Sequence, residues 1–200
     1  MTSTLVLASG STIRAEMLTN AGLSFDVVKP RVDEEALKAA LLAEGTKPRD
    51  LADALAEMKA QRVAMKARPE QLVIGSDQVL EIEGEVLSKP ADRDEAAAHL
   101  RRLSGKPHML HSAAVIFEDN RPVWRAVSTV RLRVRDLSDS YIKSYLDRNW
   151  PEVGYCVGAY QVEAEGIRLF SRIDGEYFAI LGLPLLDLLN YLTVRGLIET

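Results

Sequence analysis

This sequence lacks the features of a secreted, disulfide-stabilised or membrane-spanning protein. Its one cysteine, Cys156, cannot form a disulfide within the chain, which agrees with a reducing compartment. No stretch approaches the roughly 18 apolar residues of a membrane span. The apolar run near the N-terminus is too short for a secretory signal and has no basic start. We therefore expect a cytoplasmic protein that does not interact with a membrane.

The chain also has no excess of positive charge. Its formal net charge of −4 argues against non-specific binding to a nucleic-acid backbone, although local positive charge can still bind a phosphorylated small molecule. Apolar residues make up 47% and charged residues 27%, both close to globular averages, and there are no repeats or low-complexity segments. We expect one compact domain over residues 1–200, with a small molecule as its partner.

Strand and helix signals alternate in the first half of the chain, and strand signals dominate the second half. Short apolar runs and alternating patterns predict strands at residues 4–8, 25–28, 72–74, 79–82, 86–87, 109–118, 123–134, 167–173 and 178–181. Helical periodicity and capping residues predict helices at residues 12–20, 34–43, 50–67, between 92 and 105, and at 138–148 and 184–194. This order favours an α/β fold with a mixed sheet flanked by helices.

The segment LASGSTIR, residues 7–14, places small and hydroxyl residues between a predicted strand and a predicted helix. Backbone N–H groups and the positive end of the helix dipole attract anions at such a position. Ser9, Ser11 and Arg14 can therefore hold phosphate, although the segment lacks the Gly-Lys-Ser/Thr ending of a Walker loop. The alternative is an ordinary helix capped by Ser11 with a solvated arginine.

Asp77 and two lysines are candidates for chemistry on a phosphorylated ligand. Asp77 follows a predicted buried strand, at the carboxyl end of the sheet where open α/β folds bind ligands, so it can act as a base. Its alternative role is that of a turn residue. Lys59, in an apolar helix, and Lys89 would neutralise a polyphosphate if they converge on one cleft; otherwise both are surface charges.

An acidic cluster supplies candidate metal ligands. Asp33, Glu34 and Glu35 follow a predicted strand, and their oxygens suit a hard divalent cation such as Mg²⁺ or Mn²⁺. The alternative is favourable negative charge in the first turn of a helix. The three histidines lack the spacing of a metal site, and we interpret them as structural.

Together and in this order, these segments resemble the Maf family of nucleotide pyrophosphatases from Leu5 to about Leu192. The matching blocks are LASGSTIRAEML, VDEEA, LAEMKA, VIGSDQVLEIEGEVLSKP, LRRLSG, VGAYQVEAEGIRLF and ILGLPL. The resemblance implies hydrolysis of a nucleoside triphosphate to the monophosphate and pyrophosphate. It also implies a mixed twisted sheet in two lobes around a central cleft, similar to the inosine-triphosphate pyrophosphatase fold, and often a homodimer.

The resemblance gives each candidate residue a role. It implies that the triphosphate is contacted by Ser9, Arg14, Lys59 and Lys89. It also implies that Glu34 binds Mg²⁺ or Mn²⁺ and that Asp77 is the proton acceptor.

Ile13, Gln78 and Glu163 bear on the choice of base. Gln78 and Glu163 look like the subgroup that prefers 7-methyl-GTP, and a carboxylate can accept hydrogen bonds from both N1–H and N2–H₂ of guanine. Ile13 stands where many members have arginine and where the subgroup commonly has tryptophan, so it offers no π face to a methylated base. We expect 7-methyl-GTP as substrate; the alternatives are dTTP or UTP, or a non-catalytic nucleotide-binding regulator of cell division.

Overall fold

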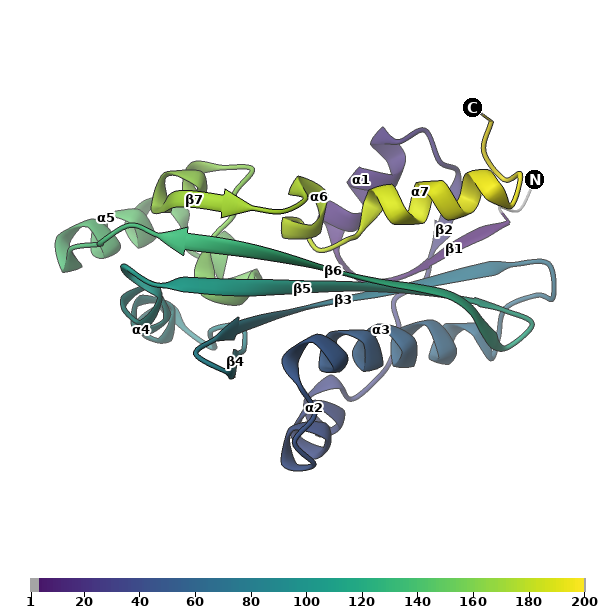
Figure 1. The fold of residues 1–200 in the computed structure, drawn as a ribbon, viewed down its shortest axis with the longest axis horizontal. Coiled ribbons are helices and arrows are strands. Elements are labelled where there is room, and N and C mark those ends of the chain that lie inside the picture. The colour runs from purple at the N-terminus through teal and green to yellow at the C-terminus, as the bar shows by residue number, and fades with distance from the viewer. Residues whose placement is uncertain (1–3, 200) are drawn as a thin grey trace.

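A seven-stranded sheet forms the centre of the computed structural model, which describes residues 4–199 (Figure 1). Its strands are β1 (Leu5–Ala8), β2 (Phe25–Val27), β3 (Leu72–Ile82), β4 (Glu85–Leu87), β5 (Pro107–Glu118), β6 (Arg121–Val134) and β7 (Phe170–Asp174). Their order is β2-β1-β3-β5-β6-β7, and β4 pairs with β3 beside that path. β1 is parallel to β2 and β3, whereas the other pairs are antiparallel. The predicted mixed sheet is confirmed.

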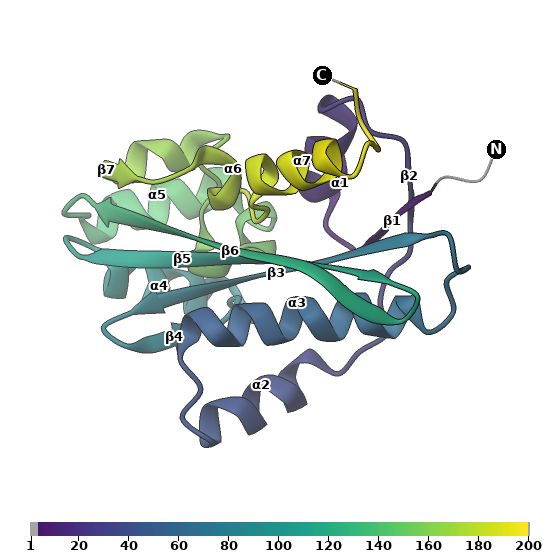
Figure 2. The same ribbon diagram turned by 45° about the vertical axis from the view of Figure 1, so that its right-hand side comes forward.

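Helices cover both faces of this sheet. They are α1 (Thr12–Asn20), α2 (Glu34–Ala43), α3 (Pro48–Ala64), α4 (Arg93–Leu103), α5 (Asp139–Asn149), α6 (Tyr177–Ile180) and α7 (Leu185–Val194), with 3₁₀ turns η1 (Glu152–Tyr155), η2 (Val157–Ala159) and η3 (Glu165–Leu169). α3 lies on one face, α1, α6 and α7 lie on the other, and α2 lies outside α3 (Figures 1 and 2). Among the described residues no helix is long and apolar enough to span a membrane.

β3 is apolar on both faces because it is covered on both. Val73 and Val79 are buried in the cluster that packs against α3. Leu72 and Ile74 point to the opposite face and are buried with α1 and α7. Since successive side chains of a strand point to opposite faces, this continuous apolar run is what a central strand requires.

The buried residues gather at the two ends of the long strands. One cluster lies among β4, α4, α5 and the 3₁₀ turns, at the left of Figure 1. Two more lie at the other end, against α3 and against α1 and α7. β3, β5 and β6 extend through both ends, so the molecule has two lobes that share one sheet.

The structure corrects three expectations about the elements. Residues 178–181, predicted as a strand, belong mostly to α6, and residues 167–169 form part of η3. Periodicity cannot separate a short buried strand from a short buried helix, which explains both errors. β3 also continues past Gly75 through Asp77. Gly75 is required by close packing, because a Cβ there would lie 2.3 Å from the carbonyl oxygen of Ala56 on α3.

His108 on β5 is buried among aromatic side chains, in ring contact with Tyr160 and Phe170. Its Nε2 lies 2.7 Å from the Tyr160 hydroxyl, and its buried Nδ1 has no hydrogen-bond partner among the described residues. Burial lowers the pKa of His108 to about 4, because the charged imidazolium would lose its hydration. The folded protein therefore keeps this imidazole neutral in mildly acidic solution.

Acidification is expected to destabilise the protein through His108. An unfolded histidine has a pKa of about 6.5, so between about pH 6.5 and 4 the unfolded chain binds a proton that the folded chain does not, and stability falls as the pH falls. The unfolding free energy of the unmodified protein and of His108→Gln can be measured by urea denaturation at pH 7 and at pH 4.5. The decrease between the two pH values should be about 2 to 3 kcal/mol smaller in His108→Gln. Equal losses in the two proteins would contradict the assignment to His108.

Candidate active site

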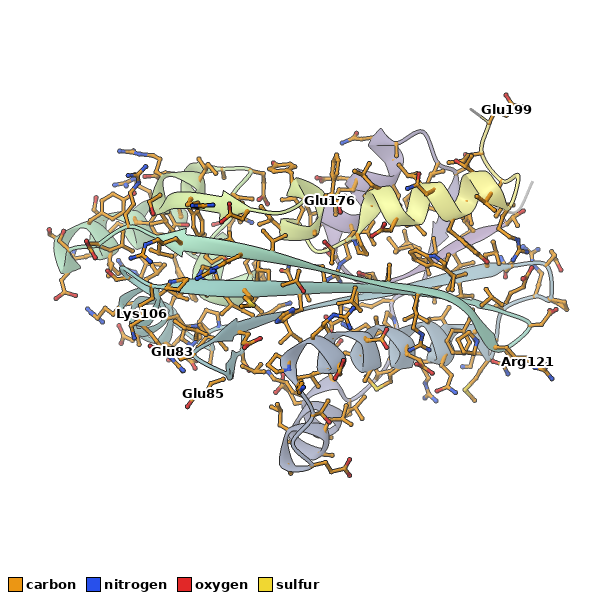
Figure 3. All side chains as sticks on the ribbon, in the orientation of Figure 1. Glu83, Glu85, Lys106, Arg121, Glu176 and Glu199 are labelled. Carbon is orange, nitrogen blue, oxygen red and sulfur yellow. The ribbon has the colours of Figure 1, made fainter. Side chains whose placement is uncertain are left out.

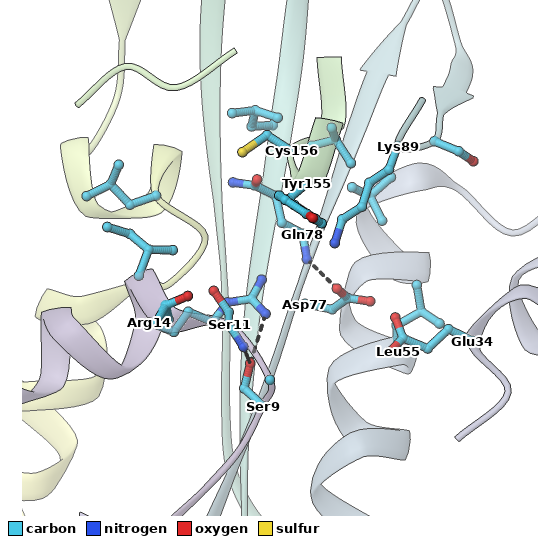
Figure 4. Close-up of a pocket in the computed structure, with 18 of the residues that line it drawn as sticks. Ser9, Ser11, Arg14, Glu34, Leu55, Asp77, Gln78, Lys89, Tyr155 and Cys156 are labelled. Carbon is cyan, nitrogen blue, oxygen red and sulfur yellow. Dashed lines mark hydrogen bonds between the residues drawn. The ribbon is translucent and has the colours of Figure 1, made fainter. Parts of the chain in front are cut away.

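A gap along one edge of β3 positions the candidate site. β1 pairs with this edge only as far as Gly75, and β4 pairs with the same edge from Leu80 onward. Residues 76–79 therefore have no strand beside them there, whereas β5 continues along the other edge. A cavity of about 930 Å³ opens at this gap, a size that suits a small-molecule ligand. Figure 4 shows side chains from both lobes pointing into it.

The alternation of β3 gives the cavity two chemically different walls. Asp77 points toward α3, where it meets Lys59. Ser76 and Gln78 point to the opposite face, where they bond to backbone carbonyls in and just after α6. The unpaired part of β3 thus presents the Asp77 carboxylate on one face. On the other face it presents Ser76 and Gln78, whose side chains are hydrogen-bonded to carbonyls of residues 179–182.

Lys59 links two carboxylates from different elements. Its Nζ lies 2.9 Å from Glu34 Oε2 at the start of α2 and 3.1 Å from Asp77 Oδ1 on β3. Lys59 is only 6% exposed, so its ammonium acts in a poorly solvated environment where charge interactions are strong. Asp77 Oδ1 also accepts a hydrogen bond of 2.9 Å from the backbone N–H of Gln78. Within residues 4–199, Asp77 Oδ2 accepts no hydrogen bond.

Arg14 is a buried cation held by backbone carbonyls. Its Nε donates to Gly182 O at 2.8 Å, and its Nη1 donates to Ser76 O at 3.0 Å and to Ser9 Oγ at 3.4 Å. Burial lowers the pKa of Arg14, and the nearby carboxylates of Asp77 and Glu34 oppose this shift. The guanidinium stays charged, because its pKa starts far above neutrality. No carboxylate among the described residues forms an ion pair with it, so it can receive an anionic ligand.

The start of α1 adds hydrogen-bond donors beside Arg14. Ser11 occupies the N-cap position as predicted, but its side chain makes no capping hydrogen bond. Its backbone N–H donates instead to the buried Ser9 Oγ at 3.2 Å. The first turn of α1 therefore keeps uncapped N–H groups where it borders the cavity, as anion binding requires.

Besides Lys59, three lysines line the cavity: Lys89, which the sequence indicated, and Lys38 and Lys29, which it did not. Lys89, after β4, is exposed on the wall formed by the second lobe. Lys38 on α2 hydrogen-bonds to Ser88 Oγ across the cavity, and Lys29 packs over Gly10. Lys38 follows Glu34 by four residues, so both lie on one face of a helix. That spacing was the signal by which Lys38 could have been found.

Gln78 and Glu163 approach the cavity in different ways. The Gln78 side-chain nitrogen donates to Ser112 Oγ at 2.9 Å and to the carbonyls of Ala179 and Ile180 at 3.0 and 2.9 Å. These acceptors determine the orientation of the amide, so its oxygen is the end left for a ligand. Glu163 lies between η2 and η3 and lines the same cavity, as does Ile13 at the start of α1.

The carboxylates suit a metal ion that is shared with a ligand better than a closed metal site. Residues 4–199 contain no group of three or more histidine, cysteine or acidic side chains placed to hold a metal. Glu34 and Asp77 nevertheless lie on either side of the Lys59 ammonium. Mg²⁺ is often bound by one or two carboxylates together with phosphate oxygens and water, so these residues fit such an ion.

Comparison with known proteins identifies the family. Residues 4–195 match the family described as Maf-like protein. The chain belongs to the Maf family. The described fold agrees with this assignment, because its mixed sheet is flanked by helices and carries the cavity between two lobes.

Curated relatives match this Maf protein along nearly their whole lengths. A nucleoside triphosphate pyrophosphatase of Ruegeria pomeroyi is 56% identical over 200 residues, which are 100% of both chains. One from Caulobacter vibrioides is 50% identical over 192 residues, or 96% of each chain. A 7-methyl-GTP pyrophosphatase of Rhizobium meliloti is 49% identical over 195 residues, or 98% of each chain. The Maf protein described here is a nucleoside triphosphate pyrophosphatase.

The structure brings every predicted site residue to one cavity. These residues are Ser9, Ile13, Arg14, Glu34, Lys59, Asp77, Gln78, Lys89 and Glu163. One placement was wrong: Asp77 lies in the middle of β3 and not at a strand end, and the ligand-binding edge arises because β1 stops beside Gly75. Asp77 is likewise not a turn residue, and Lys59 is not a solvated surface charge.

Removal of the Arg14 guanidinium should destabilise this Maf protein even without ligand. In Arg14→Met the buried carbonyls of Gly182 and Ser76 lose their charged donor, and such hydrogen bonds contribute roughly 1.5 to 3 kcal/mol each. We expect urea denaturation to show a loss of about 2 to 4 kcal/mol. Arg62→Met on the exposed face of α3 is the control and should change stability by less than about 0.5 kcal/mol. Equal effects of the two changes would show that the carbonyls do not depend on Arg14.

Proposed function

We propose that this Maf protein hydrolyses 7-methyl-GTP to 7-methyl-GMP and pyrophosphate, as a house-cleaning enzyme for modified nucleotides. The main support is the chain of charges Asp77–Lys59–Glu34 beside the buried guanidinium of Arg14, in one cavity. Several cations are needed to neutralise a polyphosphate, and a carboxylate can serve as the base for attack by water. This cavity combines both within reach of one ligand.

In the proposed reaction Asp77 accepts a proton from the water that attacks the α-phosphorus. The bond from the α-phosphorus to the bridging oxygen breaks, and pyrophosphate leaves. Lys59 and the backbone N–H of Gln78 both hold Asp77 Oδ1, so the carboxylate has a defined orientation. Its second oxygen, Oδ2, is the one that can receive the proton.

The cations act on the phosphate groups. Arg14 and Ser9 approach from the α1 side, Lys59 from α3 and Lys89 from the opposite lobe. Because Arg14 and Lys59 are buried, their charges are fixed in position and weakly screened, so they stabilise charge that develops on the phosphates in the transition state. Lys89 is exposed and can move to meet the ligand.

Glu34 is the residue that we propose for a divalent cation, Mg²⁺ or Mn²⁺. When bound, the cation would polarise the phosphate oxygens. Glu34 is about half exposed at the start of α2, so it can turn from Lys59 toward the ligand.

The proposed base preference rests on Glu163 and on the fixed amide of Gln78. Both present acceptor oxygens to the ligand, and guanine offers two donors on one edge. A pyrimidine such as uracil needs a donor as well as acceptors, but the nitrogen of Gln78 is committed to Ser112 and α6. The name of the Rhizobium meliloti relative agrees with 7-methyl-GTP. The alternative substrates dTTP and UTP fit these acceptors less well.

The partners follow from this proposal. The substrate is a nucleoside triphosphate in the cytoplasm, without involvement of nucleic acid or membrane. A homodimer stays a prediction, which light scattering would test. A non-catalytic role in cell division is disfavoured because the pyrophosphatase relatives match the whole chain.

Asp77→Asn should abolish most turnover while leaving the fold intact. Asparagine keeps an oxygen for Lys59 and for the Gln78 N–H, but it cannot accept a proton from water. We expect kcat to fall on the order of 10²-fold or more, with little change in nucleotide affinity. Pyrophosphate release at saturating Mg²⁺ or Mn²⁺ measures this, with the exposed Asp50→Asn on α3 as control. Near-normal turnover in Asp77→Asn would exclude Asp77 as the base.

Glu163→Gln should weaken discrimination between bases. A charge-assisted hydrogen bond contributes roughly 1.5 to 3 kcal/mol, so the ratio of kcat/KM for 7-methyl-GTP to that for UTP should fall about tenfold or more. Glu152→Gln, also on the cavity wall, is the matched control and should leave the ratio unchanged. A ratio that does not change in Glu163→Gln would mean that Glu163 does not contact the base.

A further inference from the structure

Tyr155 is an exposed aromatic residue inside the cavity. It is the last residue of η1, its exposed fraction is 74%, and it belongs to the cavity wall. Figure 4 shows it pointing into the same space as Gln78 and Lys89. Among the described residues, its ring contacts no other aromatic ring and its hydroxyl makes no hydrogen bond. A large ring that stays unpacked beside a ligand cavity is available for a ligand.

The backbone that carries Tyr155 is nevertheless held firmly. Val153 of the same turn is fully buried in the core of the second lobe. Gly154 lies so close to Trp150 that a Cβ there would be 2.8 Å from the indole ring. The ring of Tyr155 is therefore presented from a fixed turn, which reduces the ordering that a ligand must impose.

The residue that follows Tyr155 lies near groups proposed to contact both the base and the phosphates. The next residue, Cys156, has its thiol pKa raised by burial and by the Glu163 carboxylate, whereas Lys89 acts in the opposite direction. Glu163 and Lys89 thus both lie near this point of the chain. Glu163 is the residue proposed to read the base, and Lys89 is proposed to contact phosphate.

We propose that Tyr155 stacks on the nucleobase and is a specificity-determining residue of this Maf protein. The proposal rests on the nucleotide substrate proposed above. Ile13 on the cavity wall has no aromatic face and Tyr160 is buried, so among the described residues of the wall Tyr155 supplies the exposed π surface. An electron-rich phenol ring attracts a cation, and the methylated base of 7-methyl-GTP is positively charged. Stacking on Tyr155 therefore favours this base over neutral guanine.

The test separates contact with the base from contact with phosphate. Affinities of Tyr155→Leu and Tyr155→Phe for 7-methyl-GMP, GMP and inorganic tripolyphosphate are measured by calorimetry, beside kcat/KM for the triphosphates. Tripolyphosphate has no base, so stacking cannot affect it. Tyr177→Leu, an exposed tyrosine outside the cavity wall, is the matched control.

We expect Tyr155→Leu to weaken 7-methyl-GMP binding about tenfold or more and GMP binding less, with tripolyphosphate changed less than about twofold. Tyr155→Phe keeps the ring and should stay within about threefold of the unmodified protein. The proposal is overturned if Tyr155→Leu binds the monophosphates normally, if it loses tripolyphosphate equally, or if the unmodified protein binds no monophosphate. If the unmodified protein binds the monophosphates but turns over no triphosphate, the proposed function is refuted. The affinities of the Tyr155 variants for the monophosphates would then still decide whether Tyr155 stacks on the base.

Discussion

The unpaired edge of β3 at residues 76–79 is the constraint on which the site depends. β1 and β4 both pair with this edge. β1 ends beside Gly75 and β4 begins only beside Leu80, so neither strand covers the residues between. Backbone groups exposed by such a gap need partners, and buried ones almost always find them. Ser76 O obtains its partner from Arg14, which draws a guanidinium into the interior. The requirement to satisfy a backbone carbonyl therefore also installs a cation where an anionic ligand can bind.

Buried charges of this kind are weak sources of stability. Removing an ammonium or guanidinium from water is costly, and attraction to carboxylates only partly offsets the cost. Lys59 is compensated by two carboxylates, whereas Arg14 is compensated by neutral carbonyls. Apolar residues could replace these cations without cost to the fold only if the carboxylates and carbonyls that face them were replaced as well. The retention of these cations is therefore explained better by ligand binding than by folding.

Local patterns were sufficient to predict most elements and to single out Ser9, Arg14, Glu34, Lys59, Asp77 and Lys89 as candidates. Ile13, Gln78 and Glu163 came from the resemblance to the Maf family. The loop of residues 9–11, the run that ends in Asp77 and the acidic start of α2 each stood out because strand, turn and helix signals are local. What could not be predicted was contact between distant segments. The predicted strand stopped before Gly75 because nothing nearby in the sequence shows that α3 approaches this glycine's backbone. The commitment of Gln78 to Ser112 and α6, and the exposure of Tyr155, likewise depend on segments far apart in the chain.

The continuous strands limit how the two lobes can respond to a ligand. β3, β5 and β6 run through both lobes with unbroken pairing at the cavity, so a large hinge would have to disrupt their hydrogen bonds. α2 is different, because none of its residues is fully buried. Within residues 4–199, its side chains form polar links to other elements through Glu34–Lys59 and Lys38–Ser88. Both links end at cavity residues, where a polyphosphate and its metal ion would compete for the same groups. Adjustment to the ligand is therefore expected at α2, while the sheet keeps Asp77, Gln78 and the base-reading wall in place.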